Sequence, residues 1–194
     1  RYGTYQSDPD VPKQYCVGSG YFQGYSRGHM LASEDRQCSA SANKQTFFMT
    51  NMHPQFERFN GYDSQGDYVW LNAEKLVRSL YQYWNSNDNG LDTIYVVKGG
   101  TIDKQEHILG YTSNNNSSKI IVPRYFYMAI LYRHANLKTG ENWKAIALWI
   151  PHTEGDTTSG TNIARQYAIS IDELEEKTDI DFFHNLPDYI ENNV

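Results

Sequence analysis

Two short segments of the chain combine side chains that can act together on a phosphodiester. The first contains Arg27, Gly28 and His29. In an extended segment, residues 27 and 29 point to the same side, so an imidazole that takes a proton near neutral pH would lie beside a fixed cation. Gly28 would let another backbone or a ligand approach closely. This combination suits phosphodiester cleavage, whereas a lone histidine is more often structural.

The second segment is a predicted helix in which Glu74 and Arg78 are four residues apart and share one flank. Two interpretations are open: a surface ion pair that contributes about 0.3–0.5 kcal/mol, or a carboxylate and a guanidinium beside a cleft. Between the two segments, Asn60 precedes Gly61. This pair is a strong turn signal, and the Asn60 oxygen is also an acceptable ligand for a hard cation such as Mg²⁺.

The elements around these residues predict a mixed fold. Runs of β-branched and aromatic residues bounded by turn residues predict buried strands at residues 46–50, 93–98, 125–132 and 144–150. A helix is predicted over residues 67–84, because apolar residues there repeat every three or four positions and form one stripe. The stripe consists of Trp70, Ala73, Val77, Leu80 and Trp84. A second helix is predicted at residues 170–177, where Ser170 and Glu173 have the spacing of a capping box.

Because helices and strands do not alternate regularly, these elements predict an α+β fold rather than a doubly wound α/β fold. The 194 residues fit a single domain, residues 1–194, with an antiparallel sheet core. No run approaches about 18 consecutive apolar residues, which excludes a membrane span.

The net charge of −6 is unevenly distributed along the chain. Residues 171–194 carry eight acids and one base, and the remaining residues carry 16 bases and 15 acids. A nearly neutral body can still hold a local basic groove, because charges are screened beyond about 10 Å at ordinary salt. Nucleic acid therefore stays among the candidate partners.

The order of the motifs resembles that of the DNA/RNA non-specific endonucleases, a family with a ββα-metal active site. The motifs are Arg27-Gly28-His29, Asn-x-x-Pro-Gln at residues 51–55, Phe-Asn-Gly at residues 59–61, and Trp-x-x-x-Glu-x-x-x-Arg at residues 70–78. They cover over a quarter of the chain, and weaker likenesses follow at residues 97–100, 122–127 and 181–183.

The resemblance implies a role for each matching residue. His29 falls on the general base, which would activate water, and we expect activity to fall below about pH 6 for that reason. Asn60 falls on the direct ligand of a hydrated Mg²⁺, with Mn²⁺ or Ca²⁺ as substitutes, and Glu74 on a carboxylate that holds the metal through water. The remaining implied roles are catalytic or substrate-binding for Arg27 and Arg78, and structural for Asn51. Apart from the resemblance, Arg58 is a candidate contact for the substrate phosphate.

Two features depart from the family's pattern. Ser26 stands where the family usually has Asp, so it either replaces an orienting hydrogen bond or weakens the site. The stretch between Asn60 and Trp70 is longer than usual and carries Asp63 and Asp67, which would face solvent or shape access to the metal. Neither departure removes a residue with a direct chemical role.

The resulting hypothesis is a Mg²⁺-dependent hydrolase, an endonuclease that cuts both DNA and RNA. One alternative is a catalytically silent nucleic-acid-binding module on the same fold, which Ser26 and the acidic tail support. Another is an ordinary α+β domain in which the motifs are coincidental. A phosphodiester-directed mechanism needs no base contacts, so low sequence specificity is expected.

Cys16 and Cys38 are the two cysteines, and either a disulfide or two separate thiols fits their number and spacing. An indiscriminate nuclease endangers its host, so the resemblance implies export or a protein inhibitor. A Cys16–Cys38 bridge would fit export. We expect a secreted or periplasmic protein whose targeting segment is absent from this chain. The sequence leaves the oligomeric state open, with a homodimer as one alternative.

Overall fold

The structure is a computed structural model that describes residues 3–86, 91–112, 119–134 and 143–186. The strands are β1 (Ser26–His29), β2 (Met52–Gln55), β3 (Tyr62–Asp63), β4 (Gly66–Asp67), β5 (Leu91–Gly100), β6 (Ile108–Tyr111), β7 (Ile121–Pro123), β8 (Tyr125–His134), β9 (Trp143–Pro151) and β10 (Ala168–Ile169). The helices are α1 (Ala40–Gln45), α2 (Glu57–Asn60), α3 (Val69–Ser86), α4 (Thr161–Tyr167) and α5 (Ile171–Thr178). Short 3-10 helices include Ser33–Arg36 and Met49–Asn51.

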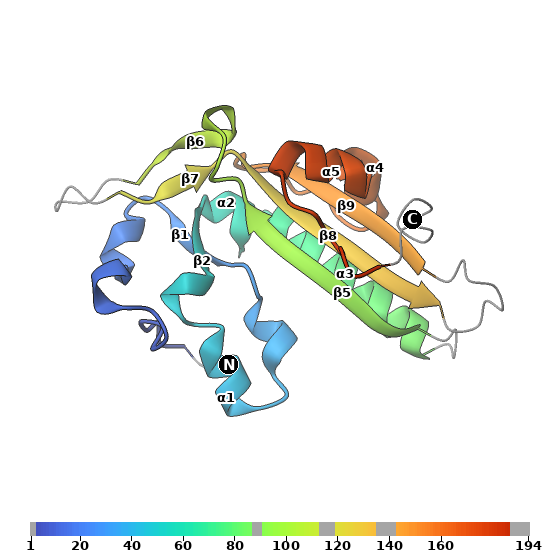
Figure 1. The fold of residues 1–194 in the computed structure, drawn as a ribbon, viewed down its shortest axis with the longest axis horizontal. Helices are drawn as coiled ribbons and strands as arrows, with labels where there is room; N and C mark the ends of the chain where they lie inside the picture. Colours follow the sequence, from blue (N-terminus) through green and yellow to red (C-terminus); the bar gives the residue numbers. More distant parts are fainter. Residues whose placement is uncertain (1–2, 87–90, 113–118, 135–142, 187–194) are drawn as a thin grey trace.

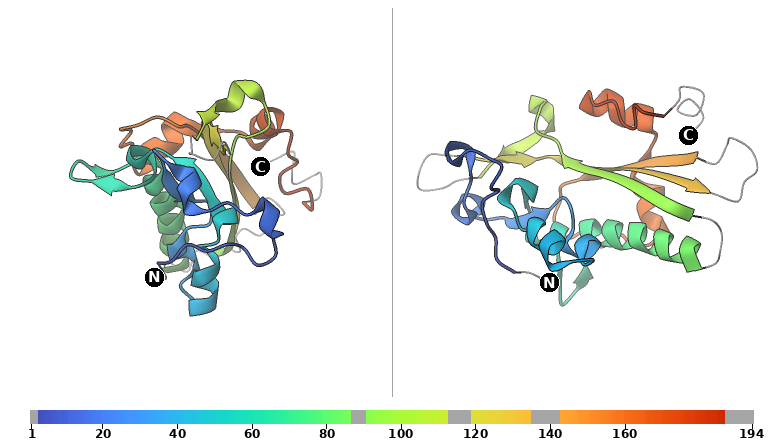
Figure 2. Two further views of the ribbon diagram at one scale, coloured as in Figure 1. Left: turned by 90° about the vertical axis from the view of Figure 1, so that its left-hand side faces the viewer. Right: turned by 60° about the horizontal axis from the view of Figure 1, so that its bottom comes forward.

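The central sheet has the strand order β10-β9-β8-β5, and its neighbouring strands are antiparallel. Successive side chains of β8 point to opposite faces. Phe126, Met128 and Ile130 pack with α3 and α4 on one face, and Tyr127 and Ala129 pack with α5 on the other. Figures 1 and 2 show α3 and α5 on opposite sides of the sheet. Because β8 is covered on both faces, it reads as a continuous apolar run, whereas the edge strand β5 leaves Tyr95 and Val97 exposed.

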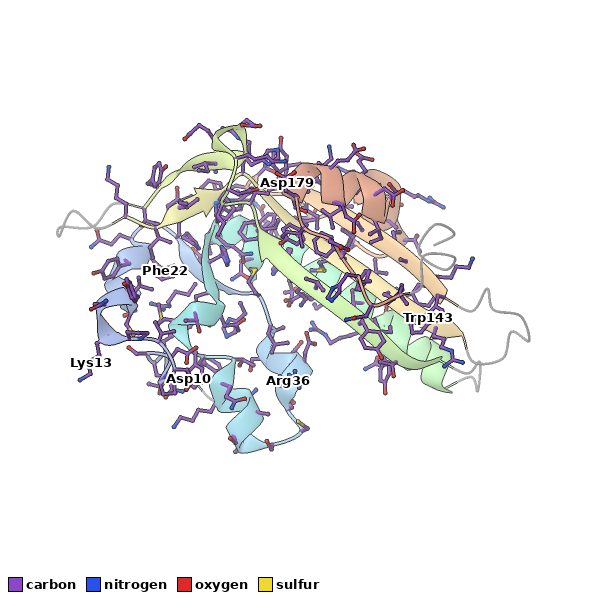
Figure 3. The ribbon with its side chains drawn as sticks, viewed as in Figure 1. Asp10, Lys13, Phe22, Arg36, Trp143 and Asp179 are labelled. Atoms are coloured by element: carbon purple, nitrogen blue, oxygen red, sulfur yellow. The ribbon has the colours of Figure 1, made fainter. Side chains whose placement is uncertain are left out.

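The N-terminal third packs at one end of the central sheet, around the antiparallel pair β1–β2 (Figure 1). Its own small core contains Phe22, labelled in Figure 3, together with Met49 and Met52. The β6–β7 hairpin packs beside β2. The helix α2 contacts both β1 and α3, so the segment with Arg27 and His29 and the segment with Glu74 and Arg78 lie near each other.

Most of the predicted elements are confirmed. The strands expected at residues 93–98, 125–132 and 144–150 lie within β5, β8 and β9, and the α+β class is confirmed. The long helix is α3, which begins at Val69 because residues 66–67 pair in the β3–β4 hairpin instead. Trp70 and Ala73 of the predicted stripe are buried in the main core, and the side chain of Trp84 lies outside the described residues.

The helix predicted near residue 170 is α5, and its cap forms as expected. The Ser170 hydroxyl accepts a hydrogen bond from the backbone N–H of Glu173 at 3.0 Å. Of the acidic tail, residues 187–194, which include Asp188 and Glu191, lie outside the described residues. Within the described ranges, no helix is both long and apolar enough to cross a membrane.

The strand predicted at residues 46–50 is wrong. Thr46 ends α1, and the N–H groups of Phe47 and Phe48 donate to Lys44 and Gln45 in helical turns. Phe47 and Met49 are buried, and pairing is limited to an isolated bridge between Phe48 and Gln6, so the apolar run reflects burial of a turn rather than a strand. The strand in this region is β2, which starts two residues after the predicted one ends.

Candidate active site

His29 is the last residue of β1, opposite Met52 of β2. Its half-buried ring packs edge-on against Phe47, with centroids 5.0 Å apart, and lies 6.1 Å from the ring of Tyr5. These aromatic neighbours restrict the imidazole to one side of the strand. The segment that follows is fixed by Asn51, whose side chain bonds to the backbone of Leu31.

Gly28 is required by the packing of β2 rather than by a ligand. A Cβ at this position would overlap the side chain of Gln55, which is fully buried. The close approach expected at Gly28 is therefore made by the protein's own amide side chain. Ser26 opens β1 opposite the same Gln55 and is half-buried.

Asn60 is the last residue of the one-turn helix α2, and the packing of its neighbour holds it there. Phe59 is fully buried and stacks on Trp70 of α3, with centroids 6.0 Å apart. The backbone N–H of Asn60 donates to Phe56 at 3.1 Å. A short helix of four residues is thus anchored by one aromatic side chain, which leaves the Asn60 amide half-buried at the edge of the core.

The side chains of His29, Asn60 and Glu74 line one cavity of about 540 Å³. They come from β1, α2 and α3, which are brought together by tertiary packing. Asn60 and Glu74 offer amide and carboxylate oxygens, the donor chemistry that Mg²⁺, Mn²⁺ and Ca²⁺ accept. Among the described residues, no three His, Cys, Asp or Glu side chains gather as a metal cage. The residues present fit a cation that keeps most of its waters, because Mg²⁺ commonly binds in this way.

Glu74 is buried, with 8% of its surface exposed, and two cations flank it. The Lys98 ammonium lies 3.0 Å from its Oε1, and the Arg78 guanidinium lies 4.0 Å from its Oε2. Burial raises the pKa of Glu74, and the charges of Lys98 and Arg78 oppose that rise. Glu74 and Arg78 therefore do not form an isolated surface ion pair. They belong to a larger group of charged side chains in which Glu74 is buried.

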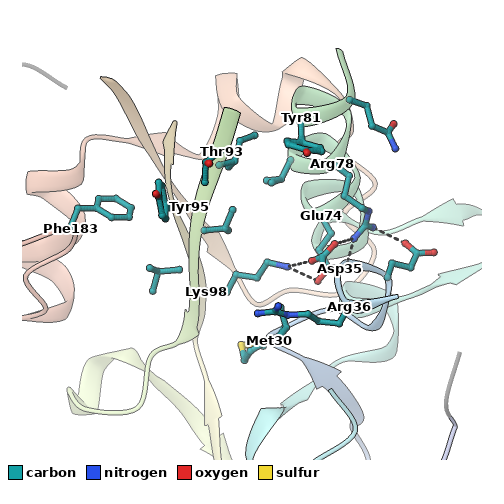
Figure 4. A pocket seen from close by; sticks show the side chains of 17 residues that line it. Met30, Asp35, Arg36, Glu74, Arg78, Tyr81, Thr93, Tyr95, Lys98 and Phe183 are labelled. Atoms are coloured by element: carbon teal, nitrogen blue, oxygen red, sulfur yellow. Dashed lines mark hydrogen bonds and ion pairs between the residues drawn. The ribbon is translucent and has the colours of Figure 1, made fainter. Parts of the chain in front are cut away.

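Arg78 is bound mainly by the 3-10 helix Ser33–Arg36. Its guanidinium lies 2.9 Å from Asp35 and 3.0 Å from Glu34, and Asp35 is also 3.5 Å from Lys98 (Figure 4). This charge cluster borders a groove of about 910 Å³ between α3 and β5. A phosphate would have to compete with two carboxylates for Arg78.

Sequence reasoning missed Glu34, Asp35 and Lys98 as parts of this cluster. Lys98 ends an apolar strand run, and a lysine in such a place is a signal for a buried partner. The two acids lie within six residues of His29, but nothing local indicates that they reach Arg78, more than forty residues away.

Arg27 differs from the other site arginines because no described carboxylate lies within ion-pair distance of it. Its guanidinium lies over the ring of Tyr5, 4.2 Å from the centroid, and its buried Nε has no hydrogen-bond partner among the described residues. Arg27 and His29 lie two residues apart on β1. The positive charge of Arg27 is thus uncompensated near the expected base.

Arg58 is held by the β3–β4 hairpin, which is the long stretch noted in the sequence. Its Nε donates to the Tyr68 hydroxyl at 2.7 Å, and Asp63 lies 3.6 Å away. These contacts raise the pKa of Arg58, and the Tyr68 hydroxyl lowers the pKa of Asp63. Asp67 lines the cavity with His29 and pairs with Lys75 at 2.6 Å. The hairpin therefore shapes one wall of the cavity through Asp67, while Asp63 engages Arg58.

Cys16 and Cys38 are free thiols in the structure, so the disulfide alternative is not realised there. The Cys16 sulfur faces the carbonyls of Val11 and Pro12, 3.5 and 3.7 Å away, within its own segment. Cys38 is exposed in the turn between the 3-10 helix Ser33–Arg36 and α1. The two thiols are not bonded to each other in the structure. A disulfide therefore gives no argument for export.

Comparisons with known proteins show which family this chain resembles. A model of the DNA/RNA non-specific endonuclease family matches residues 1–189. The chain is 28% identical over 186 residues to a mitochondrial nuclease of Saccharomyces cerevisiae, covering 94% of this chain and 54% of that protein. It is also 28% identical over 175 residues to a nuclease of a Nostoc species, covering 88% and 55%. The chain thus spans about half the length of these relatives.

A solved structure of the EndoG/EndoGI complex, which concerns the mechanism of EndoG inhibition, has the same fold. It superimposes with a TM-score of 0.68 at 18% identity and covers 95% of this chain and 70% of that chain. The mixed fold with antiparallel sheets is therefore shared.

Proposed function

Because this chain belongs to the DNA/RNA non-specific endonuclease family, we propose that it is a hydrolase that cuts phosphodiester bonds in both DNA and RNA with Mg²⁺ as cofactor. The observation that carries the proposal is the convergence of His29, Asn60 and Glu74 on one cavity. Three chemically suitable side chains from three separate elements face the same volume, and surface packing alone gives no reason for that arrangement.

His29 acts as the general base in this proposal. It takes a proton from water as the water oxygen bonds to phosphorus. The bond from phosphorus to the leaving oxygen then breaks, and the leaving oxygen keeps the electron pair and takes a proton from solvent water. A positioned base of this kind contributes about 10²–10⁴-fold to the rate. The aromatic contacts of His29 with Phe47 and Tyr5 hold the imidazole ready for that transfer.

In this proposal Arg27 is the main side chain that stabilises the transition state electrostatically. The phosphate gains negative charge as the fifth bond to phosphorus forms, and preorganised cations stabilise that charge. Its guanidinium is free of carboxylates among the described residues. Arg58 and Arg78 are bound to Asp63 and to Asp35, respectively, so their contact with a phosphate requires exchange of partners.

Asn60 would hold the cation directly and Glu74 through water, as hard oxygen donors do. Bound there, Mg²⁺ would supply Lewis acidity at the phosphate, and Mn²⁺ or Ca²⁺ fit the same donors. Lys98 and Arg78 keep the Glu74 side chain in place on the wall of the cavity.

The decisive experiment is nicking of supercoiled plasmid by the purified chain with Mg²⁺, with EDTA, and with the variants Asn60→Ala and His29→Ala. We expect nicking that requires the metal, disappears with Asn60→Ala and falls more than tenfold with His29→Ala. A single-stranded RNA substrate in parallel tests the absence of sugar preference, which follows from chemistry directed at the phosphate.

Folded protein that binds plasmid but leaves it intact in excess Mg²⁺ would favour the silent binding module, with Ser26 as the first residue to restore to Asp. Near-normal turnover in His29→Ala would remove His29 from the mechanism. Neither result would alter membership of the family, which rests on the match over residues 1–189.

A nuclease without sequence preference must be kept away from its own genome, and we propose export to a secreted or periplasmic location or a protein inhibitor as the means. The related fold of EndoG is known in a complex with EndoGI, which supports the inhibitor. Light scattering of the purified chain decides between a monomer and the homodimer that the sequence leaves open.

A further inference from the structure

Tyr5 lies in the N-terminal segment, more than twenty residues before the first active-site motif, yet its ring contacts that motif. The Arg27 guanidinium lies over the ring face at 4.2 Å from the centroid. The His29 ring lies 6.1 Å away at 51°. Phe47 packs edge-on against both rings, at 5.6 Å from Tyr5 and 5.0 Å from His29. One tyrosine thus adjoins both side chains that β1 presents.

Among the described residues, the Arg27 guanidinium contacts the side chain of Tyr5. No described carboxylate pairs with Arg27, and its buried Nε makes no hydrogen bond there. An aromatic face attracts a cation without using its N–H groups. Arg27 is therefore held by a contact that uses none of its N–H groups, and its two terminal nitrogens, unlike the buried Nε, remain for an anion.

The Tyr5 ring packs against the small core of Phe22, Met49 and Met52, but hydrogen bonds of its neighbours also attach this segment to the rest of the protein. The N–H of Gln6 donates to Phe47 at 3.1 Å, and the N–H of Met49 donates to Gln6 at 2.9 Å. The Thr50 hydroxyl donates to Asp8 at 2.7 Å. A substitution at Tyr5 can therefore remove the ring and leave the segment docked.

We infer that Tyr5 is a positioning residue of the active site, whose ring holds the Arg27 guanidinium in the orientation that receives the scissile phosphate. This inference rests on the proposed nuclease function. Its chemistry is general: a planar guanidinium that lies on a ring keeps its edge directed outward, where a phosphate accepts two parallel hydrogen bonds.

The test compares Mg²⁺-dependent plasmid nicking by Tyr5→Leu, Tyr5→Phe and the wild-type chain, with thermal unfolding measured for each. We expect kcat to fall about tenfold in Tyr5→Leu and to stay within about twofold of wild type in Tyr5→Phe, which keeps the ring. Tyr15→Leu is the matched control, because Tyr15 is an N-terminal tyrosine that is 69% exposed. It should cleave like the wild type.

A double-mutant cycle with Arg27→Ala separates positioning from general stability. If Tyr5 acts through Arg27, Tyr5→Leu costs less than about twofold in the Arg27→Ala background. An equal cost in both backgrounds, full activity of Tyr5→Leu, or a tenfold loss in Tyr5→Phe would overturn the inference. If the wild type and Tyr15→Leu also fail to cleave, the proposed function falls, and the inference falls with it.

Discussion

The Asn51 side chain brackets the peptide groups of Leu31 with two hydrogen bonds. Its Oδ1 accepts from the Leu31 N–H at 2.8 Å, and its Nδ2 donates to the Leu31 carbonyl at 2.9 Å. Nδ2 also donates to the carbonyl of Thr46 at 2.8 Å. One amide therefore fixes the chain two residues after His29 to the end of α1.

Replacing Asn51 with Ala should lower the free energy of unfolding by about 1–2 kcal/mol, because two exposed hydrogen bonds to Leu31 and a partly buried one to Thr46 are lost. Plasmid nicking should fall as well, since the exit of β1 is released. Urea denaturation measures the first effect. Asn162→Ala, at an exposed position of α4, is the control and should leave both quantities unchanged. An equally stable Asn51→Ala protein would contradict the structural role.

Gly28→Ala should destabilise the protein by about 1–3 kcal/mol, because the new methyl group overlaps the buried Gln55 side chain. Gly110→Ala, in β6, meets no atom within 4 Å and serves as the control. Denaturant midpoints measure both. Adding Gln55→Ala should recover part of the loss in Gly28→Ala, and no recovery would mean that Gly28 is needed for another reason.

Stability should rise with pH between about 4 and 6.5, because two histidines are neutral in the folded protein. Burial lowers the pKa of His53 and of His152 to about 4 in each case. His152 accepts the N–H of Phe56 at 2.8 Å, and protonation of its Nε2 would break that bond. The unfolded chain binds these protons near pH 6.5, so the stabilisation is full above that pH and is lost as pH falls towards 4.

Each histidine contributes at most about 3 kcal/mol over this range. Urea denaturation at pH 4.5, 5.5 and 7 measures the slope, and His53→Leu should make it shallower. His184→Ala is the control, because His184 is exposed. An unchanged slope in His53→Leu would show that His53 takes up its proton in the folded state as it does in the unfolded chain.

Lys98→Met should cost about 3–5 kcal/mol, since it leaves Glu74 buried beside an uncharged side chain. Lys98→Arg keeps the charge and should cost less. Combining Lys98→Met with Glu74→Gln should cost less than the sum of the single changes, because the pair is removed together. Thermal and urea unfolding check all four proteins, and additive losses would mean that the two residues do not interact.

The sequence alone determines the residue types of the candidate active site and their order along the chain. His29, Asn60 and Glu74 lie in motifs a few residues long, and α3, β8 and β9 follow from local patterns of apolar residues that a single segment carries. The cap of α5 is predictable for the same reason, because Ser170 and Glu173 are three residues apart.

The partners of those residues depend on the tertiary structure, because they arise from contacts between distant segments. The position of Arg78 on α3 does not reveal that Asp35 and Glu34 bind it, and the spacing of the cysteines leaves their pairing open. Residues 46–50 resemble a strand because burial and strand pairing select the same apolar residues. The local sequence pattern determines which side chains a segment carries and whether it favours a helix or a strand. Charge pairing, burial and the stacking of Arg27 on Tyr5 depend instead on packing between distant segments.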